Sequence, residues 1–222
     1  MKKSKLAIIF DFDNTLVKSS INFPAMKISM ARHAKKYGID FGKDEEVPRK
    51  YTAGNIIDEV KKYDKKNNAN LAEELWEMVE KFERLGMESI TIDQDIYPML
   101  EFLKEKGIST SILTNNSKKP TIEVLERYNI TNYFDIVLAR EDIEKMKPDK
   151  EGLITIINKL SLNPDDVLFI GNSWVDGVAA TNANLRFVLI RKNALDPDKY
   201  NIKIWKHVKS IKELTELLRK SC

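Results

Sequence analysis

Two aspartates stand directly behind the first apolar run of the chain, in the sequence Asp11-Phe12-Asp13-Asn14-Thr15. Side chains two positions apart on an extended segment share a face, so both carboxylates can point at one site. Two close carboxylates repel each other unless a cation lies nearby or one of them is protonated. The pair therefore suits a nucleophile and an acid held by Mg²⁺, and the other interpretation is a surface Asx turn that ends a strand.

Three later segments also carry polar side chains behind apolar runs. Thr114 and Asn115 supply a hydroxyl and a backbone N–H that can hold phosphate oxygens, although the same residues are ordinary in turns. Lys147 precedes a proline, which biases its backbone toward an extended conformation and presents the ammonium group. Asn172 and Asp176 follow a glycine and are one helical turn apart if a helix begins there.

The elements that position these residues are five short apolar runs with helical patterns between them. Each run is continuous rather than alternating, which favours strands buried on both faces of a parallel sheet, although a helix can show such a run. The expected strands are 6–12, 108–113, 134–139, 167–170 and 187–190. The helical patterns are 98–106, 121–128, 151–160 and 211–218. The alternation predicts a doubly wound α/β domain with right-handed crossovers.

Ligands bind such open sheets beyond the carboxyl ends of the strands, where the polar segments lie.

Residues 16–94 break the alternation and show three helical patterns, at 23–37, 48–63 and 69–86, with a solvated loop at 64–70. The last pattern has one apolar stripe: Leu71, Leu75, Met78, Val79, Phe82 and Leu85. The insertion is expected to form a second, smaller, all-helical domain.

The composition excludes several classes of protein. The 222 residues carry 37 Lys and Arg against 34 Asp and Glu, a net charge of +3, which argues against a nucleic-acid-binding domain. Cys222 is the only cysteine, so neither a disulfide framework nor a cysteine-based zinc site is expected. No apolar stretch approaches the length of about 18 residues that spans a membrane, and the N-terminus lacks a signal-peptide pattern. A cytoplasmic location is expected.

Together, the four polar segments resemble the motifs of the haloacid dehalogenase superfamily of phosphotransferases and hydrolases, and the resemblance covers the whole chain. The matching segments are Asp11-Phe12-Asp13-Asn14-Thr15, Ile112-Leu113-Thr114, Lys147-Pro148 and Gly171-Asn172-Ser173-Trp174-Val175-Asp176. The resemblance implies a Rossmann-like, five-stranded parallel sheet in the order 3-2-1-4-5. It also implies a catalytic core of residues 1–15 and 95–222 and a helical cap of residues 16–94 that closes over the site.

The resemblance further implies a role for each motif residue. Asp11 would attack phosphorus to give an aspartyl-phosphate, while Asp13 would protonate the leaving oxygen and later activate water. Thr114 and the N–H of Asn115 would hold the phosphoryl group, and Lys147 would offset its negative charge. Dehalogenases of the superfamily lack a carboxylic acid at the position of Asp13, so its presence favours phosphate esters.

Mg²⁺ would be held by Asp11, the backbone carbonyl of Asp13, Asn172 and Asp176. Phosphatases of this pattern carry aspartate at position 172, and the amide found here brings no charge to the cation. The resemblance therefore implies weaker metal affinity, with Asp176 relatively more important.

The function expected on these grounds is a Mg²⁺-dependent phosphatase that acts on a small phosphorylated metabolite, as a monomer or homodimer. A phosphomutase with the same two aspartates is one alternative. A phosphometabolite-binding protein with weakened catalysis is another, suggested by Asn172. Nucleic acid and membrane partners are not expected.

Overall fold

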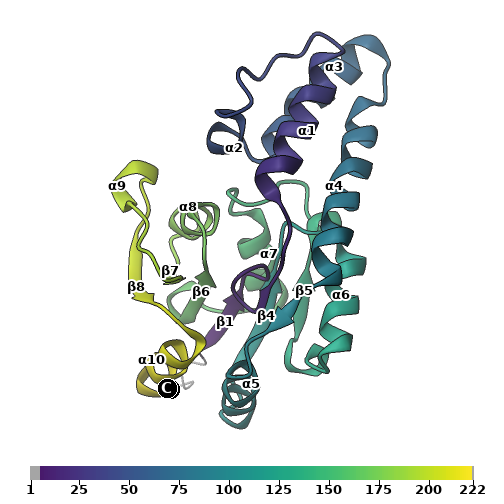
Figure 1. Ribbon diagram of the computed structural model, residues 1–222. Helices are drawn as coiled ribbons and strands as arrows, with labels where there is room; N and C mark the ends of the chain where they lie inside the picture. Colours follow the sequence, from purple (N-terminus) through teal and green to yellow (C-terminus); the bar gives the residue numbers. More distant parts are fainter. Residues whose placement is uncertain (1–5, 222) are drawn as a thin grey trace. The chain divides into compact units, whose positions relative to one another are not determined.

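The structure is a computed structural model that describes residues 6–221 (Figure 1). It divides into two compact units, Met1–Ser19 with Ile90–Cys222, and Ser20–Ser89. Cys222, the residue behind the expectation of no disulfide framework and no cysteine-based zinc site, lies outside the described residues. None of the helices between residues 6 and 221 combines the length and the apolar character that crossing a bilayer requires.

The first unit is built on a parallel sheet. Its strands lie in the order β5-β4-β1-β6-β7-β8. They are β1 (Ala7–Phe10), β4 (Ser109–Leu113), β5 (Ile136–Leu138), β6 (Val167–Gly171), β7 (Arg186–Ile190) and β8 (Ile204–Val208). The central strands β1 and β6 are buried along their whole length, because each is a continuous apolar run with a neighbour on both sides. The α/β fold class is confirmed, and the five predicted strands stand in the predicted order.

The predicted number of five strands is wrong, because β8 adds a sixth at the edge beside β7. Its sequence interrupts any apolar run with Lys206 and His207, both exposed, and Trp205 is 36% exposed. A strand that is bonded on one side only needs no continuous apolar run, so the pattern that identified the other five did not apply to it.

Helices and short 3₁₀ turns connect the strands. The helices of this unit are α5 (Ile96–Glu105), α6 (Lys118–Arg127), α7 (Glu151–Lys159), α8 (Trp174–Asn182), α9 (Pro197–Tyr200) and α10 (Ile211–Ser221). On one face, Leu153 of α7 and Ala179 of α8 share a core cluster with Ile9 and Phe169 of the sheet. Helices α5 and α10 lie next to each other and contact β4 and β8, respectively (Figure 1).

A two-stranded antiparallel ribbon marks both ends of the helical insertion. It pairs β2 (Val17–Lys18) with β3 (Thr91–Ile92). Both strands belong to the sheet-containing unit, so the helical unit, Ser20–Ser89, lies within the predicted 16–94. Two-residue strands are too short to produce a periodic pattern, so the sequence does not predict them.

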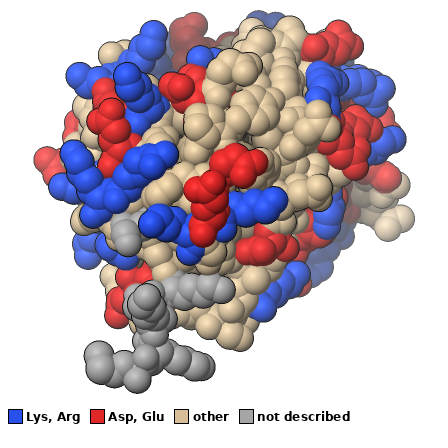
Figure 2. All heavy atoms as spheres, turned by 90° about the horizontal axis from the view of Figure 1, so that it is seen from below, with Lys and Arg blue, Asp and Glu red and all other residues tan. Residues whose placement is uncertain are grey.

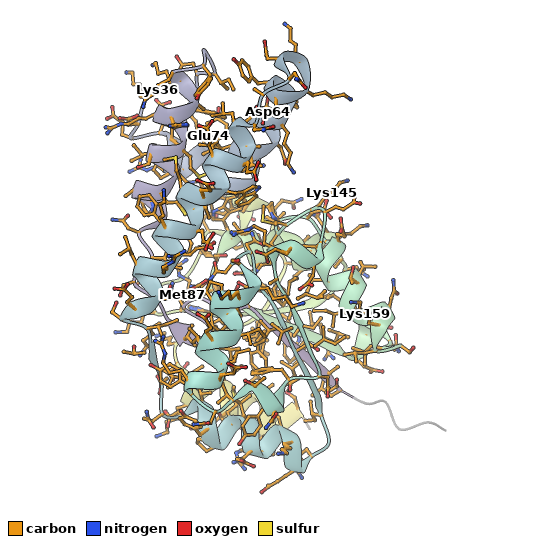
Figure 3. The ribbon with its side chains drawn as sticks, turned by 90° about the vertical axis from the view of Figure 1, so that its right-hand side faces the viewer. Lys36, Asp64, Glu74, Met87, Lys145 and Lys159 are labelled. Carbon is orange, nitrogen blue, oxygen red and sulfur yellow. The ribbon has the colours of Figure 1, made fainter. Side chains whose placement is uncertain are left out.

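The helical unit contains α1 (Phe23–Lys35), α2 (Val47–Lys50), α3 (Ala53–Asn67) and α4 (Leu71–Glu88). Its own core includes Met30, Ile56 and Leu75, all fully buried. The Asp64 carboxylate, labelled in Figure 3, accepts the backbone N–H groups of Leu71 and Ala72 at 3.0 and 2.8 Å, which fixes the start of α4.

Three details of the helical unit differ from prediction. The single pattern 48–63 is two helices, because Thr52 adopts an extended conformation and caps α3 through the N–H of Asn55 at 3.1 Å. Helix α3 continues to Asn67, so the predicted loop 64–70 is shorter than expected. Leu85 was expected in the apolar stripe of α4 but is 66% exposed.

Candidate active site

Asp11 lies in the turn that follows β1 and is buried, with 7% exposure. Its backbone N–H donates to the carbonyl of Ile170 at 2.8 Å, which continues the pairing of β1 with β6. Asn14 adopts φ 56°, so the chain turns back on itself and Thr15 reaches Asp11. The Thr15 hydroxyl donates to Oδ2 of Asp11 at 2.9 Å, which fixes the orientation of the carboxylate.

Lys147 bridges two carboxylates. Its ammonium donates to Oδ1 of Asp11 at 2.6 Å and to Oδ1 of Asp176 at 2.7 Å. Burial alone would lower the pKa of Lys147, but the two carboxylates outweigh it and raise the pKa above its ordinary value. Lys147 therefore stays charged in a buried position, where its interaction with an anion is poorly screened.

The pKa of Asp11 is raised from 3.8 to about 7. Burial is the largest cause, the Asp176 carboxylate adds to the rise, and Lys147 opposes it. Without a further cation, this carboxylate is therefore partly protonated near neutral pH.

Asp13 lies in the same turn and is 9% exposed. The Asn116 amide donates to Oδ2 of Asp13, while Oδ1 is a buried atom without a hydrogen-bond partner among the described residues. Burial raises the pKa of Asp13, and the hydrogen bond from Asn116 opposes the rise. The protonated form that can act as a general acid is therefore favoured more than in an exposed aspartate.

The loop after β4 brings three polar residues to this edge of the sheet. Thr114 is 1% exposed, and its hydroxyl oxygen accepts the N–H of Asn116 at 3.1 Å. The Asn115 amide donates to the carbonyl of Lys147 at 2.8 Å and accepts its N–H at 3.0 Å. Hydrogen bonds thus connect this loop to the Asp13 carboxylate and to the backbone of Lys147.

The turn after β6 positions Asp176 at the start of α8. Oδ2 of Asp176 accepts from the N–H groups of Asn172 and Ser173 at 3.2 and 3.0 Å, and from the Ser173 hydroxyl at 2.6 Å. A Cβ atom at Gly171 would lie 2.6 Å from the Asp176 side chain, so only glycine leaves room for this carboxylate. Asp176 is therefore held by the helix start on one side and by Lys147 on the other.

The predicted site residues lie together at the carboxyl ends of adjacent strands. One network of hydrogen bonds joins Asp11, Lys147, Asp176 and Asn115, and a second joins Asp13 to the loop that carries Thr114. Asn172 joins the first network through its backbone only. The roles assigned to these residues stay predictions.

Three residues whose side chains contact the carboxylates were not assigned a role from the sequence: Thr15, Asn116 and Ser173, of which Ser173 belongs to the Gly171–Asp176 motif. Thr15 belongs to the Asp-x-Asp-x-Thr motif, so the motif itself carried that signal. Asn116 contacts Asp13 across 103 positions of the chain. Its polar type after an apolar run was visible in the sequence, but its partner depends on the alignment of β4 beside β1.

The chain matches the family model described as haloacid dehalogenase-like hydrolase over residues 8–190. The chain belongs to the haloacid dehalogenase-like hydrolases. This confirms the resemblance and places the chain in a family of hydrolases.

Relatives within the haloacid dehalogenase-like hydrolases match nearly the whole chain. The "Putative pyrophosphatase PpaX" of Caldanaerobacter subterraneus subsp. tengcongensis is 25% identical over 95% of this chain and 96% of its own. The phosphoglycolate phosphatase of Aquifex aeolicus is 24% identical over 86% of this chain and 89% of its own. A solved HAD-superfamily hydrolase from Geobacter sulfurreducens shares the fold, with a TM-score of 0.60 at 19% identity, covering 96% of this chain and 100% of that one.

The charge of this haloacid dehalogenase-like site fits a divalent cation. Three buried carboxylates, those of Asp11, Asp13 and Asp176, face one ammonium, that of Lys147. The unpartnered Oδ1 of Asp13 and the raised pKa of Asp11 both indicate negative charge that the protein does not fully offset. Within residues 6–221, no three His, Cys, Asp or Glu side chains are grouped to hold a metal, so a cation would need neutral oxygens as well.

Proposed function

We propose that the protein hydrolyses a small phosphomonoester through an aspartyl-phosphate intermediate on Asp11. The observation that carries the proposal is the buried Lys147 ammonium, 2.6 Å from Asp11. It favours the ionised, nucleophilic form of a carboxylate whose pKa burial otherwise raises. It also supplies positive charge next to the position where a phosphoryl group would be transferred.

In the first step, an Asp11 oxygen attacks phosphorus and the bond from phosphorus to the ester oxygen breaks. Asp13 gives its proton to that leaving oxygen, which departs as an alcohol. In the second step, Asp13 takes a proton from water, whose oxygen attacks phosphorus while the bond between Asp11 and phosphorus breaks. The products are inorganic phosphate and the original form of both aspartates.

Thr114, Asn115 and Lys147 are proposed to hold the phosphoryl oxygens. The Thr114 oxygen already accepts the N–H of Asn116, so its own hydrogen is available to donate. The side chain of Asn115 is committed to the Lys147 backbone, which leaves its backbone N–H for phosphate.

A Mg²⁺ ion is proposed to be held by Asp11, the backbone carbonyl of Asp13, Asn172 and Asp176. Its chemistry would be to offset the negative charge of the carboxylates and of the transferred phosphoryl group. The oxygen-only donor set suits this ion, and the amide at Asn172 makes the site less negative than an aspartate would.

The substrate is proposed to be a small phosphorylated metabolite, as the names of the relatives suggest. The helical unit is proposed to act as a cap that excludes water during transfer. We also propose that the protein is cytoplasmic and is a monomer or a homodimer.

Figure 2 shows acidic and basic side chains interspersed over one face of the molecule. This face therefore gives no support to a nucleic-acid partner.

The decisive experiment measures hydrolysis of p-nitrophenyl phosphate with and without Mg²⁺. Asp11→Asn should lower the rate by about a thousandfold or more, because the nucleophile is lost. Asp165→Asn, a change at an exposed aspartate, is the matched control and should leave the rate unchanged. Activity that survives Asp11→Asn would refute the mechanism.

Asn172 supports one alternative, a phosphometabolite-binding protein with weakened catalysis. In that case wild-type protein would bind phosphorylated metabolites but hydrolyse none of a panel of them. The phosphomutase alternative is tested with a hexose 1-phosphate, because a mutase yields the hexose 6-phosphate and a phosphatase yields free phosphate.

A further inference from the structure

A cavity of about 530 Å³ lies behind the carboxyl ends of four neighbouring strands, β1, β6, β7 and β8. All the residues that line it belong to the sheet-containing unit. Pockets that bind small molecules usually have volumes of about 300–1,000 Å³. The cavity is therefore large enough for a small-molecule ligand.

The charged side chains that line this cavity are mostly cationic. Four of them, Lys18, Arg191, Lys192 and Lys209, face one carboxylate, that of Asp93. Lys18 is paired with Asp93 at 3.7 Å. The three remaining cations have no carboxylate partner anywhere between residues 6 and 221.

The apolar residues of the lining and the start of α10 do not neutralise the positive charge of the cavity. Leu16, Val17 and Ile190 line the cavity and are buried, so they contribute apolar surface only. Glu213 accepts the backbone N–H of Lys209 at 2.8 Å, so its carboxylate is engaged in capping α10. The cavity stays net positive with Glu213 counted.

The cavity and the acidic cluster are neighbours of opposite charge. Thr15 and Ser173 line the cavity, and their hydroxyls donate to the carboxylates of Asp11 and Asp176 at 2.9 and 2.6 Å. Among the described residues, the lining does not include those carboxylates or Lys147. A ligand in the cavity would thus be separated from the Asp11 and Asp176 carboxylates by the side chains of Thr15 and Ser173.

We propose that this basic cavity binds a small diphosphate anion at a site separate from the phosphoryl group that is hydrolysed. Arg191 donates to the backbone carbonyl of Asn172 at 3.4 Å, which leaves its charge unneutralised. Arg191, Lys192 and Lys209, at the ends of β7 and β8, therefore match a ligand with several negative charges better than they match a single carboxylate. The apolar residues of the lining accommodate the uncharged part of an esterified diphosphate.

Calorimetric titration with inorganic pyrophosphate tests the proposal, in EDTA so that no divalent cation recruits the anion to the acidic cluster. Wild-type protein should bind, and the double variant Lys192→Gln/Lys209→Gln should bind at least about tenfold more weakly, because two charge-assisted contacts are lost. Raising the salt concentration should weaken wild-type binding as well.

The matched control is Lys106→Gln/Lys159→Gln. Both lysines are exposed. Lys106 directly follows α5 and Lys159 is the last residue of α7, and these helices lead into the amino ends of β4 and β6, at the opposite edge of the sheet. This control should bind pyrophosphate like wild type. Absent wild-type binding, an unchanged affinity in the cavity variant, or an equal loss in the control would overturn the proposal.

Failure here is distinguishable from failure of the proposed function. The cavity variant retains Asp11, Asp13 and Lys147, so it should still hydrolyse p-nitrophenyl phosphate. An inactive wild type that binds pyrophosphate through the cavity would contradict the phosphatase proposal alone. Circular dichroism shows whether each variant is folded.

Discussion

The side chain of Asn115 holds both polar groups of the Lys147 backbone, donating to the carbonyl at 2.8 Å and accepting the N–H at 3.0 Å. The two residues lie 32 positions apart in the chain. This closed pair of hydrogen bonds fixes the segment from which the Lys147 ammonium reaches Asp11. Asn115 therefore positions the lysine in addition to the phosphate contact predicted for its own N–H.

Asn115→Ala should lower kcat by about ten- to a hundredfold, because a misplaced charge no longer stabilises the transferred phosphoryl group. Steady-state kinetics with p-nitrophenyl phosphate measures the effect. Asn158→Ala, on the exposed side of α7, serves as the control and should behave like wild type. A kcat unchanged in Asn115→Ala would show that Lys147 needs no such support.

Asn116→Ala should shift the basic limb of the pH–rate profile upward by about one unit. The Asn116 amide donates to the Asp13 carboxylate and thereby lowers its pKa against the effect of burial. Without that donor, Asp13 keeps its proton to higher pH and stays competent as a general acid. A profile that keeps its basic limb in place would contradict the assignment of Asp13 as the acid.

Asn172→Asp should lower the Mg²⁺ concentration needed for half-maximal rate, because it adds a charged ligand to the proposed metal site. Titration of the rate with Mg²⁺ gives this concentration for both proteins. The control Asn158→Asp adds the same charge far from the site. An unchanged Mg²⁺ requirement in Asn172→Asp would refute Asn172 as a ligand.

Mg²⁺ should raise Tm more at pH 8 than at pH 5. The pKa of Asp11 is raised from 3.8 to about 7 in the folded protein, so the folded chain binds this proton more tightly than the unfolded chain. Metal-free protein therefore loses stability as the pH rises across that interval. A cation that replaces the proton restores stability where Asp11 is ionised, by about 3 °C or more at pH 8.

Differential scanning fluorimetry at both pH values, with and without Mg²⁺, measures this difference. Asp11→Asn removes the titrating group and should reduce the pH dependence of the Mg²⁺ effect. Equal shifts of Tm at pH 5 and pH 8 in wild type would mean that Mg²⁺ does not compete with protons at Asp11.

The sheet could be predicted from sequence where burial leaves a strong pattern. The central strands β1 and β6 are apolar throughout because both faces are covered, whereas the edge strand β8 mixes Ile204 and Val208 with polar residues. The ribbon of β2 and β3 depends on a pairing between residues 73 and 75 positions apart, which no local pattern contains.

The site residues were found because each follows a strand and belongs to a motif. What the sequence could not reveal is the pairing between motifs. The contact of Asn116 with Asp13 arises only when β4 lies beside β1, and the contact of Asn115 with Lys147 only when β5 lies beside β4. The basic cavity likewise needs β8, the strand that was missed, to bring Lys209 next to Arg191.

The antiparallel ribbon has a consequence for the modularity of this protein. Because Val17 pairs with Ile92 and Lys18 with Thr91, the chain leaves the sheet-containing unit and returns to it at the same place. If the helical unit is replaced by another insertion, only the pairing of β2 with β3 needs to be preserved. The alignment of the strands in the main sheet then stays unchanged. Grafting experiments that exchange residues 20–89 between relatives therefore have natural junctions at the ends of the ribbon.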